Sequence, residues 1–391
     1  MYTHCYSHRL NLSICGSYSV QCIRNVMEQV NQLSYFFNLS QSRQLILKSN
    51  VTRHCPDSRK SKLKDVCRTR WVDRIHGMDT FEELFVPIVF TLEEMSLNSE
   101  GKYNRDTSSK ATSLLKLIMS FDFIVALVIT RCVFDLTLPV TQLLQSKTND
   151  IADGLHLIES LKNLSTSIRN SNDTYHTKWY AKALTLAYKV NVDERKPRTC
   201  GRQMNQDNIP AESVSDYFKK VLTIPLADHL HSELKNRFDT TSTNAYYGLY
   251  IIPAKMIWSL SHPGKLNWKD NFSLFSSSYL EDLTNHLALD GEFELWEKYW
   301  KTKNTCLPDN ISSTLKSINF PGFENIKILL RILATLPVTS CECERPFSAL
   351  RRLKNYNRST MVANRLNGLD LLHVHQEINP VASDKRRIEL L

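Results

Sequence analysis

The strongest candidate for a reacting group in this sequence is Glu344, within the stretch S-C-E-C-E-R-P-F-S-A-L-R-R-L at residues 340–353. It stands directly before an arginine and a proline, and an apolar-basic helical pattern follows. Such a carboxylate can belong to a cluster that binds two divalent metal ions for phosphoryl transfer, although one carboxylate cannot hold both ions alone. It can equally be a charge at a helix start, where it complements the helix dipole.

The residues around Glu344 favour the helix start when they are taken by themselves. Thr339 and Glu342 form a T-x-x-E capping signature, and Pro346 fits only in the first turn of a helix, where its missing N–H is harmless. We therefore expect a helix to begin between residues 340 and 345. A structural role is sufficient to explain Glu344 at this stage.

Two cysteine-containing motifs could in principle bind a soft metal. In H-C-Y-S-H, Cys5 and His8 lie one helical turn apart, beside His4, and Cys341 and Cys343 are separated by one residue. Zinc sites usually need a second ligand pair at a recognisable spacing, and neither motif has one. We interpret these residues as a polar helix start and as small packing residues, and we predict no metal site.

A basic run with one aromatic residue extends from Ser58 to Arg74, S-R-K-S-K-L-K-D-V-C-R-T-R-W-V-D-R. Its cations could hold phosphates, and the indole of Trp71 could stack on a base. The alternative is a solvated loop that leads into a helix burying Trp71. The piece R-K-S-K-L-K could also act as a nuclear address.

The composition indicates a globular, moderately basic protein. Lys and Arg number 49 against 40 Asp and Glu, and hydrophobic residues make up 42% of the chain, enough for a sizeable core. The 10 cysteines include no CxxC pair, which is typical of reduced, intracellular proteins. No secretory signal is recognisable at the N-terminus, so we expect a nuclear or otherwise cytoplasmic protein.

The pattern of apolar residues predicts a mainly α protein with a small β component. One core helix is indicated by apolar residues at three- and four-residue steps between Val20 and Phe37. Further helices are expected at 114–134, 151–168, 177–190 and 214–238, with linkers at 98–113 and 193–210. The apolar run Leu114–Val133 contains Asp122 and two cations, so a buried helix is expected there instead of a membrane span.

A narrow leucine-rich stripe marks the final predicted helix. It consists of Val362, Leu366, Leu369 and Leu372 at helical spacing. Such a stripe needs another apolar surface, either in this chain or in a partner.

Several segments together resemble one family. Residues 330–378 closely resemble the C-terminal dimerisation region of hAT-superfamily DNA transposases. H-C-Y-S-H-R-L-N-L near the start, C-R-T-R-W-V-D-R at 67–74 and L-P-V-T-Q-L-L-Q-S-K at 138–147 are similar to the same superfamily, in its zinc finger MYM-type protein 1-like branch. Their order along the chain is also that of the family.

The resemblance implies a ribonuclease H-like core interrupted by a large all-helical insertion. It further implies cut-and-paste transposition by an Asp-Asp-Glu cluster that binds divalent metal, in which Glu344 matches the glutamate. It makes Val362, Leu366, Leu369 and Leu372 dimerisation residues. The candidate nucleic-acid contacts are Arg68, Arg70, Trp71, Arg351 and Arg352.

The chain departs from the family at its start. The two catalytic aspartates of the family lie upstream of its H-C-Y-S-H-like segment, so we expect both to be missing here, and no cofactor to be bound unless a restored cluster holds Mg²⁺. We expect a truncated ribonuclease H-like core at 1–75, a helical insertion at 76–310 and a dimerisation region at 311–391 that completes the core.

The function predicted from these points is that of a catalytically inactive, transposase-derived protein. It would act by forming a homodimer or by pairing with a related hAT protein, with DNA as a possible second partner and no membrane association. The alternative is a fragment of an active transposase whose aspartates lie upstream of this chain.

Overall fold

The protein is mainly α-helical, as predicted. The computed structural model describes residues 6–16, 20–64, 71–99, 101–145, 151–197, 209–238, 247–261, 267–303, 306–318, 320–335, 350–351, 353–354 and 360–374. No strand occurs among these residues. The small β component is therefore absent from the described part of the chain, and the ribonuclease H-like core is not confirmed.

The described residues belong to two compact units. The larger unit, residues 9–336, holds most of the helices, and the smaller unit joins residues 1–8 with 337–391 and contains α19. The helices of the first half are α1 Tyr6–Cys15, α2 Gln21–Asn38, α3 Gln41–His54, α4 Trp71–Glu83, α5 Phe85–Leu97, α6 Arg105–Ile118, α7 Phe121–Gln145, α8 Ile151–Asn170 and α9 Asn172–Lys189. The remaining helices are α10 Val214–Phe218, the π-helical turn η2 Lys219–Thr223, α11 Ile224–Arg237, the 3-10 turn η3 Gly248–Ile251, α13 Pro253–Ser261, α14 Trp268–Ser276, the 3-10 turns η4 Ser277–Asp282 and η5 His286–Ala288, α15 Leu289–Thr302, α16 Ile311–Ser317, α17 Glu324–Thr335 and α19 Ala363–Val374.

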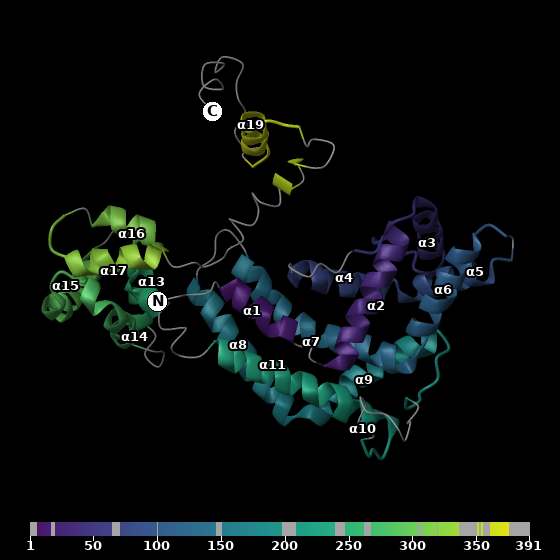
Figure 1. Ribbon diagram of the computed structural model, residues 1–391. Helices are drawn as coiled ribbons and strands as arrows, with labels where there is room; N and C mark the ends of the chain where they lie inside the picture. The colour runs from purple at the N-terminus through teal and green to yellow at the C-terminus, as the bar shows by residue number, and fades with distance from the viewer. Residues whose placement is uncertain are drawn as a thin grey trace. The chain divides into compact units, whose positions relative to one another are not determined.

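Helix α7 is the central element of the first helical group (Figure 1) and packs against α2, α4, α8 and α9. Its residues from Phe123 to Ile129 are all buried, as the long apolar run predicts. Among the described residues, the segment Phe121–Leu144 alone is long and apolar enough to cross a membrane, and 72% of its most apolar window is buried inside the protein. A helix that is apolar on every side is expected at the centre of a helical core.

Two predicted boundaries around α7 are wrong. The segment predicted as the linker 98–113 contains most of α6, because Asn104 Oδ1 accepts a hydrogen bond from Thr107 N at 2.8 Å and starts a helix there. Ala111, Leu114 and Ile118 then share one buried face. The expected helix 114–134 is accordingly two helices, which break near Ser120.

The other predicted helices are found. The apolar face predicted between Val20 and Phe37 forms the buried side of α2. The predicted helices at 151–168 and 177–190 correspond to α8 and α9. The predicted helix 214–238 is present, with the π-helical turn η2 between α10 and α11.

Helices α13 to α17 surround an aromatic cluster. Trp268, Trp296 and Trp300 are among the largest fully buried side chains. Trp296 packs edge-on against Trp300 and Phe323 at centroid distances of 5.5 and 5.0 Å, and its Nε1 donates to Ile251 O at 3.0 Å. Burying the indole with its donor satisfied avoids the cost of an unpaired polar group.

Candidate functional site

Helix α19 carries the predicted dimerisation residues, and the structure divides them into two kinds. Leu366 is 9% exposed and Leu369 is half-buried, so these two are largely covered already. Val362, just before the helix, is 67% exposed, and Leu372 is 59% exposed. The two ends of the predicted stripe are therefore open to a partner, whereas its middle is not.

Two further residues of α19 lie next to Leu372 in the sequence. Leu371 lies beside Leu372 and is 39% exposed. The Oδ1 atom of Asp370 is buried and has no hydrogen-bond partner among the described residues. Burying a carboxylate oxygen without a donor is unfavourable, so Asp370 should reduce the stability of the folded chain.

The predicted nucleic-acid and catalytic residues are only partly visible. Arg351 is exposed. Trp71 is the first residue of α4, but its side chain lies outside the described part, as do Arg68, Arg70, Arg352 and Glu344. Their roles stay predictions.

The soft-metal motifs are also only partly visible. His8 is exposed in α1. His4, Cys5, Cys341 and Cys343 lie outside the described residues. In the part of the chain that the structure describes, no three His, Cys, Asp or Glu side chains are placed to hold a metal ion.

The described part of the basic run, residues 58–64, forms a defined loop on α2. Leu63 is buried, Asn38 Nδ2 donates to Leu63 O at 3.2 Å, and Ser34 Oγ donates to Lys64 O at 3.1 Å. Because these contacts fix the loop backbone, the charged residues on either side of Leu63 point outward. Lys62 and Lys64 are exposed.

Not all cations of this loop are available to a ligand. Lys60 Nζ lies 2.9 Å from Asp79 Oδ2 and 2.7 Å from Glu83 Oε2, so its charge is paired within the protein. Arg59 is exposed and makes no ion pair with any described residue. We call Arg59, Lys62 and Lys64 the cationic loop.

A charged cluster on α4 and α7 consists of ion pairs within the protein. Arg131 Nη1 of α7 lies 3.1 Å from Asp79 Oδ1 and 3.0 Å from Asp135 Oδ2, and Arg131 Nε lies 2.6 Å from Glu82 Oε2. Burial raises the pKa of Glu82 and of Asp135, although Arg131 opposes this. For Asp79, burial is outweighed by Lys60 and Arg131, so its pKa is lowered. One guanidinium occupies the centre of three carboxylates, which is a structural ion-pair network.

The C-terminal part of the chain matches a known family region. Residues 277–378 match the hAT family C-terminal dimerisation region. The matched segment includes α15, α16, α17 and α19. This is a protein with a hAT dimerisation region, as the motifs predicted.

The chain is also similar to curated proteins along nearly all of its length. It is 26% identical over 383 residues to the "52 kDa repressor of the inhibitor of the protein kinase" of Homo sapiens, an alignment that covers 97% of this chain and 49% of that protein. The protein of the same name from Mus musculus is 27% identical over 385 residues, with 97% and 50% covered. The chain thus spans about half the length of these relatives. No solved structure matches it.

Proposed function

We propose that this chain is a non-catalytic, hAT-derived protein that acts by self-association through α19. The observation that carries the proposal is the exposed apolar surface at the two ends of the stripe. Val362, Leu371 and Leu372 are exposed inside a segment that matches a dimerisation region. A second copy would cover these apolar side chains.

The second part of the proposal is that the chain has no catalytic activity. It is supported by the relatives, which are named as repressors. A ribonuclease H-like core, the three segments 1–75, 76–310 and 311–391, and a nuclear location belong to the same proposal.

Self-association is tested by sedimentation of the full chain at micromolar concentration. Leu372→Asp should weaken the dimer at least about thirtyfold, because each of two copies would bury an unpaired carboxylate at a cost of about 1–3 kcal/mol. Leu97→Asp is the matched control, since Leu97 on α5 is 77% exposed and lies outside the matched region. A monomeric native chain, or equal weakening by both variants, would contradict the proposal.

The competing function is that of a fragment of an active transposase. It predicts metal-dependent strand cleavage or transfer that Glu344→Gln abolishes. The native chain and this variant should be compared on duplex DNA with Mg²⁺ or Mn²⁺. Activity in the native chain alone would replace our proposal with the catalytic one.

A second candidate property is binding to nucleic acid at the cationic loop. It is favoured by the three exposed cations on a backbone that Asn38 and Ser34 hold in place. Each phosphate contact releases counterions, so the affinity should fall as salt rises.

This property is tested by fluorescence anisotropy with a labelled DNA duplex. The triple variant Arg59→Gln, Lys62→Gln, Lys64→Gln should bind more weakly and with a shallower salt dependence. A matched triple variant at the exposed Lys235, Lys298 and Lys316 loses the same charge elsewhere. Equal loss in both would indicate only a net-charge effect.

A further inference from the structure

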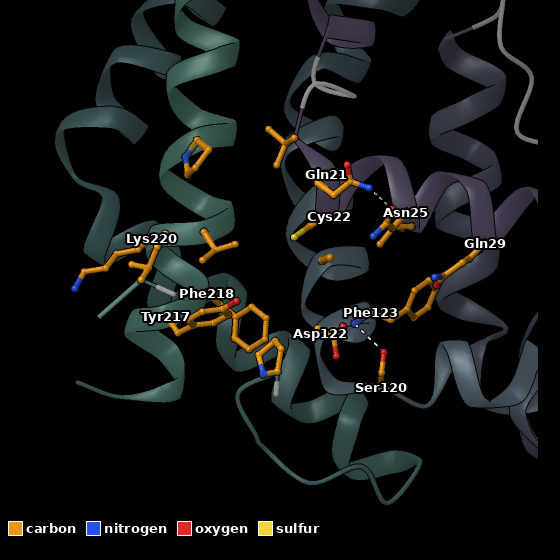
Figure 2. Close-up of a pocket in the computed structure, with 17 residues that line it drawn as sticks. Gln21, Cys22, Asn25, Gln29, Ser120, Asp122, Phe123, Tyr217, Phe218 and Lys220 are labelled. Atoms are coloured by element: carbon orange, nitrogen blue, oxygen red, sulfur yellow. Dashed lines mark hydrogen bonds between the residues drawn. The ribbon is translucent and has the colours of Figure 1, made fainter. Parts of the chain in front are cut away.

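A pocket lies between α2, the start of α7 and the η2 turn, in the larger unit (Figure 2). Its volume is about 770 Å³. None of the predicted functional residues lines it, and it lies outside the segment that matches the dimerisation region. The functions proposed above therefore do not account for this pocket.

One wall of the pocket is a column of amides on α2. Gln21, Asn25 and Gln29 recur every four residues and all line the pocket. Figure 2 shows them following one another along the helix. Four residues of an α-helix advance about 6 Å along the axis, so the column presents one amide about every 6 Å.

This spacing is close to the repeat of an extended polypeptide. Two residues of an extended chain span about 6.6 Å, and the N–H and C=O groups of every second residue point to the same edge. An amide side chain offers one acceptor and a donor pair, which is the complement of a peptide group. A column of amides with this spacing can therefore meet successive peptide groups on one edge of a strand.

The hydrogen bonds within the column show which of its amide groups are still available to bind a ligand. Gln21 is already used, since its Nε2 donates to Asn25 Oδ1 at 2.8 Å and its Oε1 accepts from Arg24. The Nδ2 group of Asn25 makes no hydrogen bond with any described residue. Gln29 Oε1 is buried without a donor. Leaving this acceptor unpaired is costly, and a backbone N–H would satisfy it.

The rest of the pocket suits the side chains of such a strand. Phe123 and Ala126 of α7 line the pocket, as do Phe218 of α10 and Val221 of η2. These surfaces can take apolar side chains. Asp122, an exposed carboxylate without an ion pair among the described residues, also lines the pocket and favours a basic side chain nearby.

We propose that this pocket binds an extended peptide segment of a partner protein by its main chain. The free edge of the segment pairs with Asn25 and Gln29, its apolar side chains contact the walls, and a Lys or Arg lies by Asp122. In this mode the main-chain hydrogen bonds supply affinity, and the pocket walls supply selectivity for alternate side chains. The inference is independent of the proposed self-association, because it uses none of the residues of α19.

The experiment begins with a selection, because the peptide sequence is unknown. A phage-displayed library of random heptapeptides is selected on the immobilised full chain and, in parallel, on the Gln29→Met variant. The enriched peptides are synthesised with blocked ends and titrated by fluorescence anisotropy. Met replaces the amide of Gln29 with a side chain of similar length that cannot hydrogen-bond.

The expected result has three parts. Gln29→Met should weaken binding about five- to tenfold, which corresponds to one lost hydrogen bond. Gln32→Met should leave it unchanged, since Gln32 is an exposed residue of α2 that does not line the pocket. Asp122→Asn should weaken binding only of peptides that carry Lys or Arg.

Methylating the peptide backbone tests the proposal without altering the protein, so the result does not depend on whether a protein variant folds. N-methyl groups on the alternate residues of one edge should abolish binding, and methyl groups on the other edge should be tolerated. The melting temperatures of the native chain and of Gln29→Met are compared as a folding control. Selection that enriches no peptide, or peptides that bind both proteins equally and tolerate methylation on either edge, would overturn the proposal.

Discussion

Glu292 of α15 caps the start of α17 by accepting the backbone N–H of Ile326 at 3.1 Å. The same carboxylate accepts the N–H of Asn325 at 3.3 Å. The residue before this helix is Phe323, whose side chain cannot accept a hydrogen bond, so a carboxylate from another helix takes the place of an N-cap side chain. This contact joins two helices of the matched dimerisation region.

Replacing Glu292 should therefore loosen that region. We expect Glu292→Ala to lower the free energy of unfolding by about 1–2 kcal/mol, the usual cost of losing a helix cap. Glu292→Gln should recover part of this, because an amide oxygen still accepts but lacks the charge that complements the helix dipole. Urea unfolding measures both, and Glu281→Ala, at an exposed acid of η4, is the control that should change little.

The two kinds of leucine on α19 should separate under mutation. Leu366→Asp buries a carboxylate inside the unit and should lower its melting temperature even at a concentration where the protein is monomeric. Leu372→Asp should leave that melting temperature nearly unchanged and act only on the sedimentation coefficient. If both variants behaved alike in the two measurements, the division of the stripe into covered and open residues would be wrong.

Arg131 should be needed mainly when its carboxylate partners are ionised. Arg131→Met should cost about 3 kcal/mol of stability near neutral pH, because Asp79, Glu82 and Asp135 would lose their shared cation. A carboxyl whose folded pKa is raised stabilises at low pH and loses that contribution as pH rises through the pKa.

The cost of Arg131→Met should accordingly be larger at pH 7 than at pH 4.5. Removing the cation raises the pKa values of Glu82 and Asp135 further, so both carboxyls carry less negative charge at the lower pH than at pH 7. Unfolding in urea at the two pH values measures this difference. Lys178→Met, at an exposed position of α9, should show no such pH dependence.

His176 should make the protein less stable in mild acid. Its Nδ1 lies 2.8 Å from Thr223 Oγ1 and its Nε2 lies 3.1 Å from Ser215 Oγ, and burial lowers its pKa below 6.5. The nearby Lys219 lowers the pKa further, whereas Asp173 and Asp216 oppose the shift. Because the unfolded chain then binds the proton more readily, stability falls as pH drops below about 6.5.

The check is a comparison of unfolding free energies at pH 7.5 and 5.5. Native protein should lose more stability over this interval than His176→Gln, which lacks the titrating group. His286→Gln, at an exposed histidine, should keep the native slope. Parallel slopes for native protein and His176→Gln would show that His176 does not titrate differently on folding.

Much of the helical fold follows from the sequence pattern alone. The apolar steps from Val20 to Phe37 predict the buried face of α2, and the long apolar run that includes most of α7 predicts a buried helix. Both depend on periodicity within one helix, which is local information. The sequence pattern does not predict the start of α6, because its cap Asn104 lies in a stretch whose composition resembles a linker.

The sequence by itself determined that this chain is helical, that its last helix carries a leucine stripe and that its motifs resemble one family. Only the tertiary structure decided which residues of that stripe stay open, since exposure depends on what the rest of the chain covers. The same holds for Glu292 with Ile326, which are 34 residues apart, and for the pocket between α2, α7 and η2. Contacts between distant segments have no sequence period, so they emerge only when the helices pack.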